Sequence, residues 1–235
     1  MKQTHTGAVL IGSGPSLANV DVGRLRAYPT IAFNRSFIAY EDWGFAPRYY
    51  ACIDHIALED NVSDINKLAE AGQVEQLFLR NSAEKLGVHQ SHNIRLIGLN
   101  DTLNFSTDLE SLGMFNTVSA VSIQILASLG YQRILLLGVD AVYRTRQSAE
   151  TMDKPYHLRA VKNDDLNHFR ADYYGKNRRF TRHNIEKQLQ GWQALATALP
   201  DHIQIKNATE GSALHVFPKI TFEAGLDWVN QGDQT

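Results

Sequence analysis

Seven short apolar runs recur along the chain, each bounded by turn-forming residues. Each run is four or five residues long and largely apolar. Parallel strands that are covered on both faces have this character. The runs lie at residues 8–11, 30–33, 49–53, 76–79, 94–97, 133–137 and 203–206. The pattern predicts a sheet that is buried on both sides.

Segments with helical spacing alternate with these runs. Residues 117–129 carry apolar side chains at helical spacing, and Gly130 stands where a helix commonly ends. Residues 63–71 and 183–199 are further helical segments, the second of which stops at Pro200. This alternation predicts an α/β fold: one Rossmann-like domain over residues 1–235, with a mostly parallel sheet and helices on both faces.

Two segments interrupt the alternation. Residues 101–116 are polar and irregular, and residues 143–180 carry many charges and aromatic rings with weak periodicity. A stretch of that length without periodicity is typical of a lid or a substrate loop. We therefore expect a small lid insertion at residues 143–182.

Composition excludes several classes of protein. The chain has 235 residues, 43% of them hydrophobic, and a net charge of -2, so it lacks the basic footprint of a nucleic-acid-binding protein. Its single cysteine, Cys52, excludes an intrachain disulfide and a multi-cysteine metal site. No segment approaches the ~20 apolar residues of a membrane span, and the apolar run near the start is too short for a signal sequence. We expect a cytoplasmic protein, and a homo-oligomer remains open.

A glycine-rich loop follows the first run, with the sequence GSGPS at residues 12–16. Glycines let a ligand approach the backbone amides, and the hydroxyls of Ser13 and Ser16 add donors. Pro15 suits the first turn of a helix, whose N-terminus would favour an anion such as phosphate. The pattern matches neither the dinucleotide-binding nor the P-loop motif. The alternative is a tight strand-to-helix turn that binds nothing.

Polar side chains also follow other runs. Asn34, Asp54 and Asp140 each stand where a predicted strand ends. The carboxyl ends of parallel strands share one edge of the sheet, so these side chains would lie near the glycine loop and could contact a ribose or a base. Singly, each is equally well explained as a helix cap or an Asx-turn.

Three segments carry a resemblance to a known family: LIGSGPSL, AFNRSF and NTVSAVSIQILASLGYQRILLLGVDAVY. They resemble bacterial CMP-sialic-acid-dependent sialyltransferases of lipopolysaccharide biosynthesis. They also resemble a broader group that includes motility accessory factors and 6-hydroxymethylpterin pyrophosphokinase-like (MptE-like) domains. The resemblance covers most of residues 7–143 and extends less closely over 163–222. It implies a modified Rossmann domain with a small lid, a CMP-sugar donor and no metal or other cofactor.

The resemblance also assigns residues by position. It places Gly12, Ser13, Gly14, Asn34, Thr117, Gly138 and Asp140 around the nucleotide. Together with Ser16 and Asp54 from the strand-end argument, these form the expected nucleotide site. Two positions depart from the family pattern: Ser13 replaces an asparagine, and Val118 replaces a serine.

The family's general base is a lid histidine, and the local match here is His168. An imidazole accepts a proton near neutral pH, as this role requires. His183 and His157 are rivals from the same region. The resemblance also suggests that Tyr173 and Tyr174 hold phosphate oxygens, although both could simply pack in the lid.

A basic cluster at Arg178, Arg179 and Arg182 could clamp a phosphate, or it could be a solvated helix entrance. The leading hypothesis for the whole chain is a metal-independent glycosyltransferase. It would move an acidic sugar from a CMP-linked donor to a surface glycan or glycoconjugate. A Mg²⁺- and ATP-dependent pyrophosphokinase-like enzyme and a non-catalytic nucleotide-binding module are the alternatives.

Overall fold

A central sheet of seven strands organises the computed structural model, which describes residues 6–143 and 148–231. The strand order is β12-β8-β1-β2-β3-β4-β5, and every pairing in this sheet is parallel. The strands are β1 (Gly7–Ile11), β2 (Thr30–Phe33), β3 (Tyr49–Cys52), β4 (Gln76–Arg80), β5 (Ile94–Ile97), β8 (Arg133–Leu137) and β12 (Gln204–Asn207). All seven apolar runs are therefore confirmed as strands.

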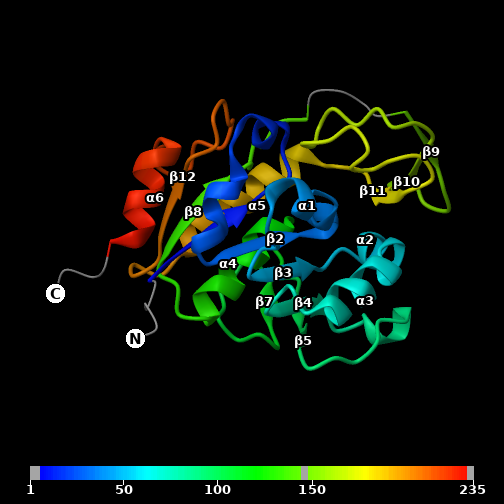
Figure 1. The fold of residues 1–235 in the computed structure, drawn as a ribbon, viewed down its shortest axis with the longest axis horizontal. Helices are drawn as coiled ribbons and strands as arrows, with labels where there is room; N and C mark the ends of the chain where they lie inside the picture. The colour runs from blue at the N-terminus through cyan, green and yellow to red at the C-terminus, as the bar shows by residue number, and fades with distance from the viewer. Residues whose placement is uncertain (1–5, 144–147, 232–235) are drawn as a thin grey trace.

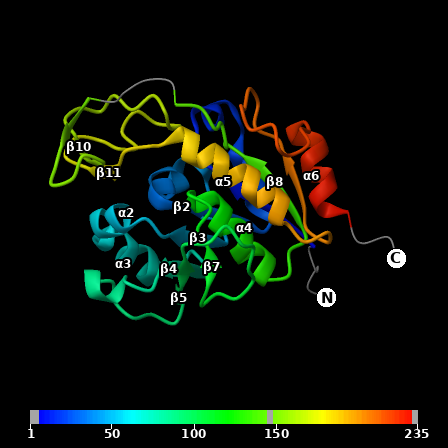
Figure 2. The same ribbon diagram turned by 180° about the vertical axis from the view of Figure 1, so that it is seen from behind.

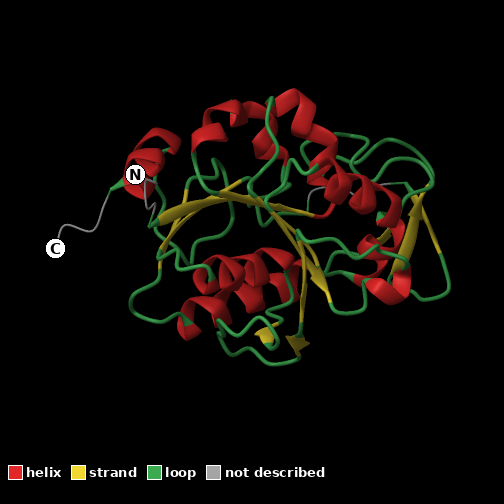
Figure 3. Cartoon of the chain, turned by 60° about the horizontal axis from the view of Figure 1, so that its bottom comes forward, coloured by secondary structure: helices red, strands yellow, loops and turns green. Residues whose placement is uncertain are grey.

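Helices cover both faces of this sheet, as Figure 3 shows. They are α1 (Tyr40–Trp43), α2 (His55–Asp60), α3 (Val62–Ala71), α4 (Val118–Ser128), α5 (Ile185–Ala198) and α6 (Phe222–Asn230), with 3-10 helices at Pro15–Asn19, Val22–Ala27, Asn34–Ala39 and Glu84–Leu86. In β1, Leu10 packs in the core formed with α4 and α5, whereas Val9 and Ile11 pack toward α6. This strict alternation of buried side chains explains why the strands read as continuous apolar runs. The Rossmann-like α/β prediction is confirmed.

The order in which the chain adds strands to the sheet changes direction at β1. Strands β2 to β5 are added on one side of β1, and β8 and β12 on the other. In open α/β sheets a ligand-binding crevice commonly forms at the carboxyl ends of the strands where this direction changes, which here are β1 and β8. Helices α4 and α5 lie side by side on one face of the sheet next to this crevice (Figure 2). The irregular segment at 101–116 lies beside them and contributes one strand to the small pair β6 (Leu99–Asn100) and β7 (Leu112–Gly113).

A second, antiparallel sheet forms part of the segment predicted as a lid. Its strands are β9 (Ala149–Thr151), β10 (His157–Ala160) and β11 (Arg179–Thr181), in the order β11-β10-β9. It projects beside the central sheet (Figure 1). Residues 144–147 of the predicted lid lie outside the described residues. These strands are short and carry polar or charged side chains, so they show neither an apolar run nor a period, and the sequence pattern missed them.

Contacts from several elements hold this insertion against the main sheet. The backbone N–H of Phe169 donates to the carbonyl oxygen of Ser13 at 3.0 Å. Arg178 and Arg179 both reach the Asp60 carboxylate of α2, at 3.4 and 3.3 Å. The buried Arg35 donates to the carbonyl oxygen of Tyr173. In the described part of the chain, no helix has both the length and the apolar character needed to span a membrane.

The Asp60 contacts predict how firmly the insertion is docked. Asp60→Asn removes the charge that Arg178 and Arg179 share, so we expect amide exchange across residues 149–181 to become roughly 10-fold faster, because local opening there costs less. Exchange in β1 and β8 should not change. Hydrogen–deuterium exchange with mass spectrometry measures both.

Glu110→Gln serves as the control, because it breaks an exposed ion pair with Arg95 on the central sheet. It should leave exchange in residues 149–181 unaltered. Equal exchange in Asp60→Asn and the unaltered chain would show that these ion pairs do not hold the insertion.

Candidate active site

Two connected cavities lie at the carboxyl edge of the central sheet. The inner cavity, about 140 Å³ in volume, is lined by the loops after β1, β2 and β8, the start of α4 and part of the insertion. The outer cavity, about 430 Å³, lies between the end of β3, the insertion and the start of α5. Asn34, Thr117, Val118, Tyr174, His183 and Gln188 line both cavities.

The glycine loop lines the inner cavity and also touches the loop after β8. The amide of Gly12 donates to the carbonyl of Leu137 at 2.7 Å, and that of Gly14 donates to the carbonyl of Gly138 at 2.8 Å. A Cβ at Gly12 would lie 2.2 Å from the Gly138 oxygen, and one at Gly14 would lie 1.9 Å from Asp140 Oδ2. Gly12 is therefore required by the close approach of the Gly138 backbone, and Gly14 by the Asp140 carboxylate and the Gly138 oxygen, so the sequence argument for ligand access alone was incomplete.

Asp140 holds the glycine loop and the loop after β8 together. Its carboxylate accepts hydrogen bonds from the amide and the hydroxyl of Ser16, at 3.2 and 2.7 Å. Ser16, which the sequence suggested as a ligand donor, therefore already has a partner and lines neither cavity. The segment that follows is a five-residue 3-10 helix rather than an α-helix, and the anion at its start is Asp140 itself. Ser13 and the loop backbone remain the groups that face the cavity.

Left-handed backbone conformations gather around the two cavities. Asn34, Asn116 and Ala141 have φ values of 52°, 56° and 54°, and Gly138 has 69°. Non-glycine residues adopt this region at a cost, and such residues cluster at functional sites. The side-chain Oδ1 of Asn34 is also buried without a hydrogen-bond partner among the described residues. It is an acceptor available to an N–H or O–H donor of a ligand.

The start of α4 points its amide end into both cavities. Thr117 is the N-cap of this helix and accepts weakly from the amide of Ser119 at 3.4 Å. Free amides and the helix dipole at this end favour a negative group. Asp54 behaves differently, because it caps α2 by accepting from the Ala57 amide at 2.8 Å and also accepts from Thr181 at 3.0 Å. It lines only the outer cavity.

His168 lines the inner cavity and pairs with Asp165. Its Nδ1 lies 2.7 Å from Asp165 Oδ2, and both side chains are buried. Burial opposes ionisation of Asp165. The hydrogen bond and the charge of His168, with the amides of Asn167 and Tyr174, nevertheless hold the pKa of this carboxyl below its ordinary value. The carboxylate therefore accepts from Nδ1–H, which leaves Nε2 as the basic nitrogen of the ring.

His183 lies beside His168, with ring centroids 5.5 Å apart. Its Nε2 is buried without a hydrogen-bond partner among the described residues. Burial, reinforced by the nearby His168, lowers the pKa of His183 to about 4. His183 is therefore neutral at pH 7 and is a weak base. The third histidine, His157, lines only the outer cavity and pairs with Asp153 at 2.9 Å.

Three further lid residues singled out from the sequence, Tyr173, Tyr174 and Arg178, differ in position. Tyr174 lines both cavities and stacks on Phe180. Tyr173 is stacked under His168, with ring centroids 4.0 Å apart, and lines neither cavity. Burial raises the pKa of both tyrosine hydroxyls. Arg178 points to Asp60 and Asp64 and also lines neither cavity.

Sequence reasoning missed several residues of the site. Asp165 stands three positions before His168, and that spacing was a usable signal for a carboxylate–histidine pair. The strained Ala141 and the buried Ser119 gave no signal of their own. No group of three histidine, cysteine, aspartate or glutamate side chains suited to a metal ion occurs in residues 6–143 and 148–231.

Comparison with known proteins gives one structural likeness. No protein-family model and no curated protein matches the chain. The fold is similar to that of a MAf glycosyltransferase from Magnetospirillum magneticum AMB-1, with a TM-score of 0.58 and 17% sequence identity over 94% of this chain. The match spans 34% of that protein. At this identity the likeness establishes the fold.

The buried His183 predicts a dependence of stability on pH. Its folded-state pKa of about 4 lies below the unfolded value of 6.5, so its contribution is complete above pH 6.5 and is lost as the pH falls toward 4. Between pH 7 and pH 5 this one group should lower the free energy of unfolding by about 2 kcal/mol. Urea denaturation at the two pH values measures the difference.

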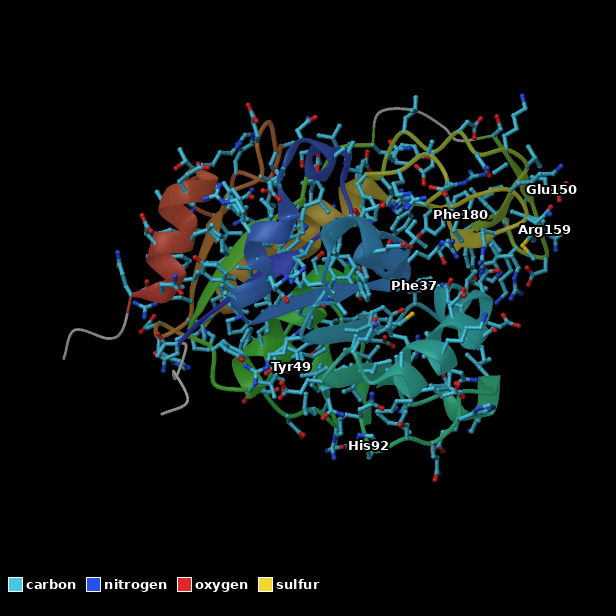
Figure 4. The ribbon with its side chains drawn as sticks, in the orientation of Figure 1. Phe37, Tyr49, His92, Glu150, Arg159 and Phe180 are labelled. Atoms are coloured by element: carbon cyan, nitrogen blue, oxygen red, sulfur yellow. The ribbon has the colours of Figure 1, made fainter. Side chains whose placement is uncertain are left out.

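His183→Gln should remove that increment from the pH dependence. His92→Gln is the matched control, because His92 is exposed at the far side of the sheet (Figure 4). An equal pH dependence in His183→Gln and His92→Gln would contradict a buried, neutral His183.

Proposed function

We propose that the chain is a nucleotide-sugar-dependent glycosyltransferase. It moves an acidic sugar from a CMP-linked donor to a hydroxyl group of a surface glycan or glycoconjugate, without a metal ion. The observation that carries the proposal is the buried His168–Asp165 pair, whose histidine lines the same cavity as the glycine loop and the start of α4. Similarity of fold to a protein described as a MAf glycosyltransferase supports this class at a coarse level.

In the proposed reaction His168 is the general base. The acceptor oxygen attacks the anomeric carbon of the donor sugar, and His168 Nε2 takes the hydroxyl proton as the new bond forms. Asp165 orients the ring through Nδ1 and stabilises the imidazolium that results. The bond between the anomeric carbon and the phosphate oxygen breaks, and the nucleoside monophosphate leaves with the electron pair. His183 is a poorer base because burial depresses its pKa.

Charge that develops on the departing phosphate needs hydrogen-bond donors. The start of α4 supplies backbone amides, with Thr117 and Ser119 as neighbouring hydroxyls. Ser13 and Tyr174 line the same cavity and add two further hydroxyls. Donors fixed in place before the reaction stabilise a leaving anion without reorganisation, which is how the chain would act without a metal. Asn34 Oδ1 is left to accept from the nucleoside.

A pyrophosphokinase-like activity makes different demands. It uses ATP and Mg²⁺, and carboxylate oxygens would have to hold the ion. At the strand ends, both oxygens of Asp140 accept from Ser16, while those of Asp54 accept from Ala57 and Thr181. These hydrogen bonds favour a structural use of the two carboxylates.

Nucleotide selectivity tests the class of reaction. Thermal shifts with CMP, CDP, UDP, GDP and ATP, each with EDTA or with Mg²⁺, should show the largest stabilisation by CMP, with or without the metal. A shift that requires both ATP and Mg²⁺ would support the phosphotransferase. A CMP shift without turnover of any CMP-linked sugar would indicate a nucleotide-binding module.

Substitutions in the histidine–aspartate pair test the mechanism. With CMP-linked acidic sugars in EDTA, His168→Asn should lower the rate of CMP release by roughly 10²–10⁴ while the Kd for CMP changes little, because the base acts in the transition state. Asp165→Asn should lower turnover at least about tenfold and alter its pH profile, because it no longer fixes the tautomer.

Asp164→Asn is the matched control, since Asp164 bonds to Ser148 rather than to His168. His183→Asn should retain more activity than His168→Asn. Full activity in His168→Asn would end this assignment, and loss in His183→Asn alone would transfer the role to His183.

A further inference from the structure

Three cationic side chains line the outer cavity without an acidic partner. Arg80 stands at the end of β4, Arg182 follows β11, and Lys187 lies in the first turns of α5. Within the described residues, none of them forms an ion pair or a side-chain hydrogen bond. The chain as a whole carries a net charge of -2, so this concentration of positive charge is local.

Arg182 differs in this respect from the other arginines described in the insertion. Arg159 pairs with Glu150, Arg170 with Asp172, and Arg178 and Arg179 with Asp60. These four arginines have acidic partners within the protein, and none of them lines either cavity. The arginine without a partner is the one at the cavity, where a guanidinium is available to bind a carboxylate or a phosphate.

The other titratable groups around this cavity do not neutralise the three cations. Asp54 supplies one carboxylate, and its oxygens accept from the Ala57 amide and the Thr181 hydroxyl. Of the three histidines, His55 is exposed, His157 is bonded to Asp153, and His183 is neutral at pH 7 because burial lowers its pKa to about 4. The lining therefore has an excess of positive charge in a concave site, which concentrates anions.

We infer that the outer cavity is a subsite for a carboxylate or phosphate group of the substrate. Its volume of about 430 Å³ is within the range of small-molecule sites. It continues into the inner cavity through Asn34, Thr117 and His183, so one bound complex can occupy both. The inference rests on the proposed function for the identity of the group: either the acid of the donor sugar or an anionic group of the acceptor.

Two binding series distinguish these sources. In the donor series, calorimetry compares CMP with CMP-N-acetylneuraminate. In the acceptor series, protein saturated with CMP is titrated with galactose 6-phosphate and galacturonate, and galactose is the neutral reference. In one of the two series, the anionic ligand should bind more tightly than its reference. Arg182→Gln with Lys187→Gln should weaken that binding roughly 10- to 100-fold, because charge-assisted hydrogen bonds are lost.

Arg159→Gln is the matched control, because Arg159 lies with Glu150 toward the outer end of the insertion (Figure 4). It should leave every affinity unaltered, and CMP should bind all variants equally. The inference is overturned if no anionic ligand exceeds its reference, or if the double variant binds the anions as tightly as the unaltered chain. Charge-dependent binding in a protein that does not bind CMP would instead refute the proposed function and retain the anion subsite.

Discussion

The site depends on the contact between the loops that leave β1 and β8. These strands pair at the point where the sheet changes its direction of growth. The amide of Gly14 bonds to the carbonyl of Gly138, and Asp140 holds the amide and hydroxyl of Ser16. This local closure fixes the inner wall of the cavity. The same contact leaves no room for a Cβ at Gly12 or Gly14. It therefore explains both the two glycines of the loop and the position of the crevice.

The insertion builds the opposite wall by meeting the glycine loop directly. The backbone N–H of Phe169 donates to the Ser13 carbonyl oxygen. This bond brings the preceding residue, His168, to the same cavity as the glycine loop. Arg178 and Arg179 dock the insertion on α2 and do not line the cavities. The arginines of the insertion thus have two roles. Those with acidic partners hold the insertion in place, and Arg182 remains available at the outer cavity.

The sequence predicted the central sheet because its inner strands are buried on both faces and therefore appear as apolar runs, whereas the edge strands β5 and β12 also carry exposed polar side chains. It could not predict the insertion sheet, whose short strands carry too little pattern, or the meeting of Arg178 with Asp60, which is 118 residues away. The polar residues at strand ends predicted where the site lies more reliably than they predicted the role of each residue. Ser16 and Asp54 stand where expected, but the partners they have are other groups of the protein. A polar side chain at a strand end suits a cap as well as a ligand, and only the fold decides between them.

The two histidines of the inner cavity have different electrostatic surroundings, and this difference separates their roles. Their ring centroids lie 5.5 Å apart, and positive charge on His168 adds to the effect of burial in lowering the pKa of His183. Asp165 contacts only one of them, through His168 Nδ1 at 2.7 Å, whereas His183 Nε2 is buried without a partner in the described structure. In the proposed reaction a neutral His183, which lines both cavities, adds no second positive charge beside the imidazolium that forms.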